Sequence, residues 1–97
     1  MAIGKDFGAG QDPSATTVTI NNTVIVPTNT KRNWLVMTNV GDVDVWYSFG
    51  KDAVARKGMF MGARGGSVVL GDTFRNGEAV NGITEAGTCL VVYQEGA

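Results

Sequence analysis

Short runs of β-branched and aromatic residues, separated by turn-forming residues, cover most of this chain of 97 residues. Turn signals, mainly glycine and asparagine, recur about every 8 to 12 residues, and no segment keeps a helical periodicity. Regular spacing of this kind is typical of a sandwich or barrel. We therefore predict an all-β protein, a small antiparallel β-sandwich or jelly roll of about eight short strands.

Two local strand pairs are expected within this pattern. The expected strands are residues 16–20, 23–26, 32–39, 44–49, 59–61, 67–70, 78–83 and 88–94. The turn at Asn21 and Asn22 predicts that the first two strands pair with each other. The next two are expected to form a hairpin around residues 39–42.

The first 14 residues differ in composition from the rest. Residues 1–14 contain three glycines and one proline, with Ile3 and Phe7 as the only large apolar groups after Met1. Such a segment buries too little apolar surface to order itself. We predict a flexible, extended N-terminal arm over residues 1–14 and a β-sandwich domain over residues 15–97. Ile3 and Phe7 are candidate partner contacts.

The alternation of side chains indicates which faces are buried. Over residues 43–49, valine, tyrosine and phenylalanine fall on one face, whereas aspartate, tryptophan and serine fall on the other. Residues 34–37 and 90–93 are instead apolar on both faces. Strands of that kind need a second covering layer or a neighbouring subunit. We therefore expect a homo-oligomer, most simply a trimer.

Composition argues against several classes of function. The chain has no histidine and one cysteine, so the usual general base and a structural zinc site are both missing. The glycine-rich residues 58–66 lack the lysine and hydroxyl residue that end a phosphate loop. Eight basic and nine acidic residues, without a basic stripe, indicate neither nucleic acid nor an anionic membrane as partner. We expect no enzyme activity, no cofactor and no bound metal. Asp42 and Asp44 are expected to be solvent-exposed residues of a turn.

Two tryptophans are the remaining candidate contacts. Trp46 is expected on the outward face between Asp44 and Ser48, where it could stack on a sugar ring or anchor a partner protein. The alternative is a ring half-buried beneath a loop. Trp34 is expected mainly to pack within the fold, and it is the second candidate partner contact. Cys89, in an apolar strand, is expected to behave as a small buried hydrophobe.

Three stretches carry a resemblance to a known family. They are "KRNWLVMTNVGDVDVWYSFG", "GARGGSVVLG" and "NGITEAGTCLVVYQE", and the similarity extends over about residues 16–95. They resemble the small jelly-roll capsid decoration (cement) proteins of tailed bacteriophages.

The resemblance implies a location and a partner. It implies a protein made in the host cytoplasm that binds the outer surface of the virion capsid, often as a trimer, and bridges major capsid protein subunits. An N-terminal segment would help to grip the shell. The alternative function is a carbohydrate- or receptor-binding module of a phage fibre or head appendage.

Overall fold

The computed structural model describes residue 10, residues 12–71 and residues 77–96, and all regular elements in these residues are β-strands. They are β1 (Ser14–Val18), β2 (Thr23–Val26), β3 (Trp34–Asn39), β4 (Val45–Phe49), β5 (Met59–Met61), β6 (Ser67–Leu70), β7 (Val80–Ile83) and β8 (Cys89–Gly96). The all-β prediction is confirmed, and β2, β5 and β6 have the bounds expected from the sequence.

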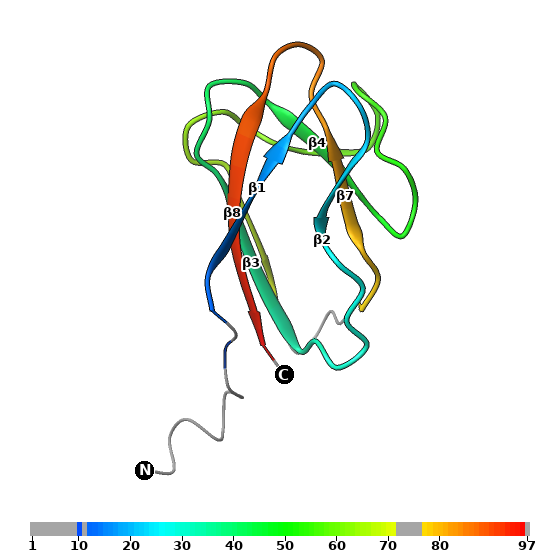
Figure 1. Cartoon of the computed structure of the whole chain (residues 1–97), viewed down its shortest axis with the longest axis vertical. Coiled ribbons are helices and arrows are strands. Elements are labelled where there is room, and N and C mark those ends of the chain that lie inside the picture. Colours follow the sequence, from blue (N-terminus) through cyan, green and yellow to red (C-terminus); the bar gives the residue numbers. More distant parts are fainter. Residues whose placement is uncertain (1–9, 11, 72–76, 97) are drawn as a thin grey trace.

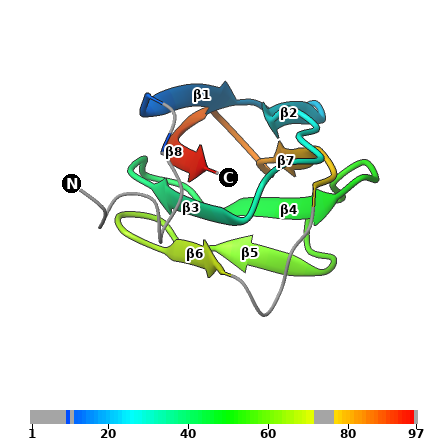
Figure 2. The same ribbon diagram turned by 90° about the horizontal axis from the view of Figure 1, so that it is seen from below.

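The strands form two antiparallel sheets that pack face to face (Figure 1). The first sheet has the order β1-β8-β3-β6, and the second has the order β2-β7-β4-β5. Figure 2 shows the two sheets side by side, with β1 next to β2 at one edge and β6 next to β5 at the other. This order is that of a jelly roll, a double-sheet fold built from two Greek keys, as predicted.

The two predicted local pairings are wrong. β1 pairs with β8, and β2 pairs with β7 in the other sheet. β3 pairs with β6 and β8, whereas β4 pairs with β5 and β7. The reason is that the connection from β1 to β2 and the connection from β3 to β4 each cross from one sheet to the other. Both strands can then bury their apolar faces in the same core, which a flat hairpin would not achieve without a further layer.

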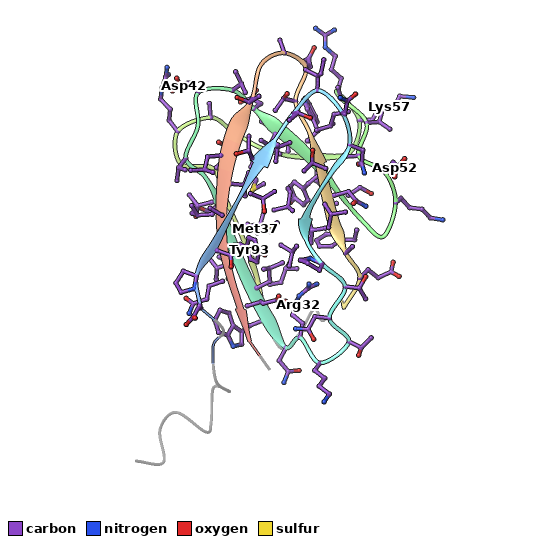
Figure 3. The ribbon with its side chains drawn as sticks, viewed as in Figure 1. Arg32, Met37, Asp42, Asp52, Lys57 and Tyr93 are labelled. Atoms are coloured by element: carbon purple, nitrogen blue, oxygen red, sulfur yellow. The ribbon has the colours of Figure 1, made fainter. Side chains whose placement is uncertain are left out.

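The core lies between the two sheets. Its fully buried side chains include Leu35 and Met37 of β3, Val45 of β4, and Val91 of β8. Figure 3 shows Met37 and Tyr93 between the sheets, whereas Asp42, Asp52 and Lys57 lie at the periphery. The predicted buried face of residues 43–49 is confirmed, and Cys89 is buried among apolar residues as expected.

Most of the predicted arm lies outside the described residues, including the candidate contacts Ile3 and Phe7. Within residues 1–14, Gly10 forms an isolated β-bridge with Gly96. Ser14 already belongs to β1, where it pairs with Tyr93 of β8. The sandwich therefore begins at Ser14, one residue before the predicted boundary.

Candidate functional site

The outer face of the first sheet carries no charged residue on its described strands. Along each strand, side chains that point outward alternate with side chains that point into the core. In the paired strands, outward residues lie opposite outward residues. The outward side chains are Ala15, Thr17, Trp34, Val36, Thr38, Ser67, Val69, Leu90, Val92 and Gln94. We call this set the uncharged outer face.

Several apolar side chains of the uncharged outer face are in contact with solvent. Val69 is 72% exposed on the edge strand β6, and its cross-strand neighbour Val36 is 37% exposed. Leu90 is 41% exposed on β8. The prediction that β3 and β8 are apolar on both faces is confirmed, because their other faces supply the buried core.

Trp34 lies at one end of this face, packed against its own chain. The indole covers Gly96 so closely that a Cβ built there would lie 2.6 Å from Trp34 Cε2. A Cβ at Gly10 would lie 3.2 Å from Trp34 Cζ2. The glycines therefore let the ring rest on the backbone, and the ring is half-buried. This placement agrees with the packing role expected for Trp34; its role as a partner contact stays a prediction.

Trp46 lies on the outer face of the second sheet, as its alternation predicted. In the register of β4 it stands opposite Ile83 of β7 on one side and Phe60 of β5 on the other. The rings of Trp46 and Phe60 are 4.9 Å apart between centroids and inclined by 38°. Phe60 is 53% exposed on this outer face. Its neighbour Met61, which is buried, holds the inward position instead.

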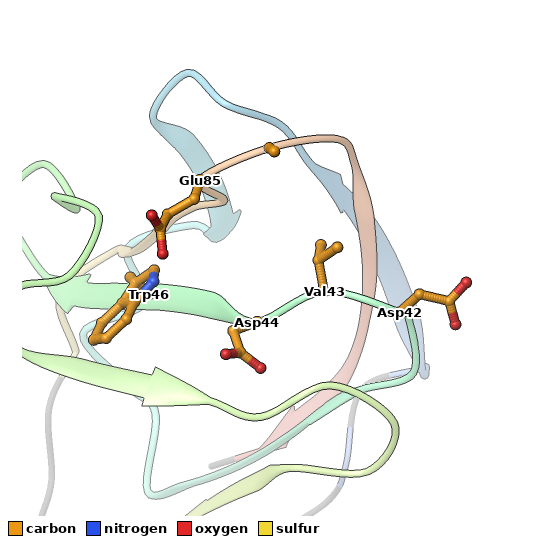
Figure 4. A pocket seen from close by; sticks show the side chains of 6 residues that line it. Asp42, Val43, Asp44, Trp46 and Glu85 are labelled. Atoms are coloured by element: carbon orange, nitrogen blue, oxygen red, sulfur yellow. The ribbon is translucent and has the colours of Figure 1, made fainter.

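A pocket of about 270 Å³ opens beside Trp46. Its lining comes from two connections at the same end of the sandwich: Asp42, Val43 and Asp44 precede β4, and Glu85 and Ala86 follow β7. Figure 4 shows the carboxylates of Asp44 and Glu85 near the indole, whereas the carboxylate of Asp42 points away from it. Glu85 could not be connected with Trp46 from the sequence, because only the pairing of β4 with β7 brings them together.

Two arginines balance the negative charge of this pocket. Arg56 Nε lies 2.7 Å from Oε2 of Glu85, and Arg64 Nε lies 3.6 Å from Oδ1 of Asp42. Asp44 Oδ1 accepts a hydrogen bond of 2.9 Å from the backbone N–H of Ala63. These ion pairs are solvent-exposed, so each stabilises the fold by at most about 1 kcal/mol.

Both arginines adopt a left-handed backbone conformation. The φ angle is 66° at Arg56 and 59° at Arg64, and no other non-glycine residue among those described has a positive φ. This conformation costs a residue with a Cβ about 1 to 2 kcal/mol. The two turns thus place a guanidinium beside the pocket's carboxylates at positions where glycine would be less strained.

Other kinds of site have no support in the described part of the chain. Among residues 10, 12–71 and 77–96, no group of three or more histidine, cysteine, aspartate or glutamate residues is placed to hold a metal ion. No helix in the same residues is long and apolar enough to span a membrane.

Comparison with protein-family models, with curated proteins and with solved structures gives no significant match. The strand order defines the class of the protein, a small jelly-roll β-sandwich. Two of its surfaces are the uncharged outer face of the first sheet and the pocket beside Trp46 on the second, whose described strands also carry no charged residue.

Proposed function

We propose that this chain is a non-enzymatic structural virion protein that binds the outer surface of a phage capsid and bridges major capsid protein subunits. The observation that carries this proposal is the uncharged outer face of the first sheet. Jelly rolls are common in viral capsid proteins, and the sequence resemblance to capsid decoration proteins favours the same role.

The absence of charge together with the exposure of Val36, Val69 and Leu90 supports a protein-binding role for this face, although the described strands of the second sheet also carry no charged residue. Apart from the buried Glu95, the described charged residues lie in the connections between strands and before β1, as Asp42, Asp52 and Lys57 illustrate (Figure 3). Contiguous exposed apolar surface is rare on monomeric proteins, and the centres of protein interfaces are depleted of charge. Valines and threonines also have few rotamers to lose when a partner orders them.

The predicted trimer is a separate part of the proposal. A trimer would bring three copies of the uncharged outer face to one position on a shell, which suits a protein that bridges capsid subunits. Sedimentation equilibrium at micromolar concentration tests it, and a single species of 10.2 kDa would contradict it.

Co-sedimentation with expanded phage heads tests the binding role. Val69→Glu places a charge at the most exposed apolar position of the face, where folding depends little on the side chain. We expect it to weaken head binding at least about tenfold, because a carboxylate buried in the interface without a partner costs more than about 1.4 kcal/mol. Val24→Glu is the matched control, because Val24 is 50% exposed on an edge strand of the other sheet. Equal retention of both variants on the heads would overturn the role given to this face.

A further inference from the structure

We propose that the pocket beside Trp46 binds one neutral pyranose ring of a glycan. This inference goes beyond capsid binding and does not depend on it, because the pocket and the uncharged outer face belong to different sheets. A chain docked through the first sheet would leave the pocket on the second sheet accessible to solvent.

The indole supplies the apolar platform that such a ligand needs. Trp46 lines the pocket, whereas Phe60, which packs against it at 4.9 Å, is not among the lining residues. Phe60 therefore supports the indole from outside the pocket. The C–H face of a pyranose is apolar and flat enough to stack on such a ring, and its hydroxyl groups stay at the rim.

The rim offers hydrogen-bond acceptors for those hydroxyl groups. The carboxylates of Asp44 and Glu85 lie beside the indole (Figure 4). Each ionised carboxylate has about four lone-pair sites. Asp44 uses one oxygen for the Ala63 N–H and Glu85 one for Arg56, so both retain acceptor capacity. Hydrogen bonds to a charged acceptor are the stronger kind, and a sugar hydroxyl is a suitable donor.

The charge balance favours a neutral ligand over a cation. Two of the three lining carboxylates, those of Glu85 and Asp42, already face a guanidinium, from Arg56 and Arg64. A lysine or arginine side chain of a partner would therefore have to compete with Arg56 for the Glu85 carboxylate beside the indole. A neutral polyhydroxylated ring avoids this competition and uses the acceptor sites that remain on Asp44 and Glu85.

The size of the pocket limits the ligand to a single ring. A volume of about 270 Å³ is below the range of about 300 to 1,000 Å³ that is usual for larger ligands. A hexose has about 12 non-hydrogen atoms, and about 0.3 kcal/mol for each gives about 3.6 kcal/mol, a dissociation constant of about 2 mM. Useful avidity would therefore require several copies of the protein on one particle.

Two-dimensional ¹H–¹⁵N NMR tests the site, because the two tryptophan indole N–H signals report on it separately. The probes are methyl α-D-glucopyranoside, methyl α-D-galactopyranoside and N-acetyl-D-glucosamine, with N-acetyl-L-arginine amide as the cationic comparison. We expect at least one sugar to shift the Trp46 signal saturably, with a dissociation constant of about 1 to 10 mM, and to leave the Trp34 signal in place. No shift with any sugar, or a tighter response to the arginine derivative, would overturn the proposal.

Two variants separate binding from folding. Asp44→Asn keeps an oxygen for the Ala63 N–H but removes the charge, and Asp44 is exposed, so the fold should be retained. We expect it to weaken sugar binding about tenfold. Trp34→Phe, on the other sheet, is the matched control and should bind as the unaltered chain does. Equal binding by Asp44→Asn and the unaltered chain would contradict the assigned contact. Head co-sedimentation should be unchanged by Asp44→Asn, so failure of this proposal is distinguishable from failure of the capsid role.

Discussion

Arg32 and Glu95 form an ion pair inside the sandwich, with Arg32 Nε 2.7 Å from Glu95 Oε1 and side chains only 1% and 8% exposed. Arg32 also donates to the backbone carbonyls of Glu78 and Pro27, at 2.9 and 2.8 Å. The guanidinium thus joins the segment after β2, the segment before β7 and the end of β8. Such a pair contributes little net stability, but the loss of one partner leaves a buried charge.

Arg32→Met should lower the free energy of unfolding by about 3 to 5 kcal/mol, because it leaves the Glu95 carboxylate buried without its cation. Arg32→Met combined with Glu95→Leu should recover part of that loss, since neither charge then remains, although the carbonyls of Glu78 and Pro27 still lack the guanidinium donor. Urea denaturation at neutral pH measures both. The matched control is Arg56→Met, whose ion pair is exposed and which should change stability by at most about 1 kcal/mol. A single Arg32 variant as stable as this control would contradict the prediction.

Asn39 holds the corner between β3 and β4, and its side chain is completely buried. Its Nδ2 donates to the carbonyls of Val43 and Met61, at 2.8 and 3.0 Å, and its Oδ1 accepts from the Gly41 N–H at 2.9 Å. The thiol of Cys89 also contacts this oxygen. Every hydrogen-bonding group of the side chain therefore stabilises the corner that places Asp42 and Asp44 at the pocket.

Asn39→Ala should cost about 2 to 4 kcal/mol, because it leaves the buried Met61 carbonyl and the partly buried Gly41 N–H without their partner, while the Val43 carbonyl keeps only the Cys89 thiol. Urea denaturation gives the loss, and the pocket signals of Trp46 in NMR spectra should shift with it. Asn21→Ala, at an exposed turn, is the control and should stay within about 0.5 kcal/mol of the unaltered chain. If Asn39→Ala matched this control, the corner would have to be held by other contacts.

The difference between these two asparagines shows what the sequence could and could not predict. Both occur at expected turns. The spacing of the turn signals predicted about eight strands, and the alternation over residues 43–49 predicted the outward position of Trp46. Strand pairing was not predictable in the same way, because a corner between sheets and a hairpin use similar turn residues. The hydrogen bond from Asn39 to Met61, the ring pair of Trp46 and Phe60, and the position of Glu85 at the pocket beside Trp46 all depend on that pairing. They are long-range consequences of the fold.

The stability of the protein should fall at alkaline pH because Tyr47 is buried. Desolvation raises the pKa of this phenol above the ordinary value of 10.0. Above pH 10 the unfolded chain therefore releases a proton that the folded chain retains, so stability falls as the pH rises. The full contribution is present below pH 10 and is lost as the pH approaches the raised pKa. Tyr47→Phe should make the decline of the urea midpoint above pH 10 shallower; an identical decline in both proteins would contradict this.

The ring pair on the second sheet should contribute measurable coupling energy. Trp46 and Phe60 face each other across β4 and β5, with their centroids 4.9 Å apart, and such pairs contribute about 0.5 to 1.5 kcal/mol beyond the area they bury. In a double-mutant cycle, Trp46→Ala and Phe60→Ala together should therefore cost less than the sum of the single changes, by about that amount. Met59→Ala is the control partner, because Met59 is similarly exposed on β5 but lies opposite Tyr47 instead. Purely additive losses for Trp46 and Phe60 would mean that Phe60 does not support the indole, and Phe60→Ala would then leave sugar binding at the pocket unchanged.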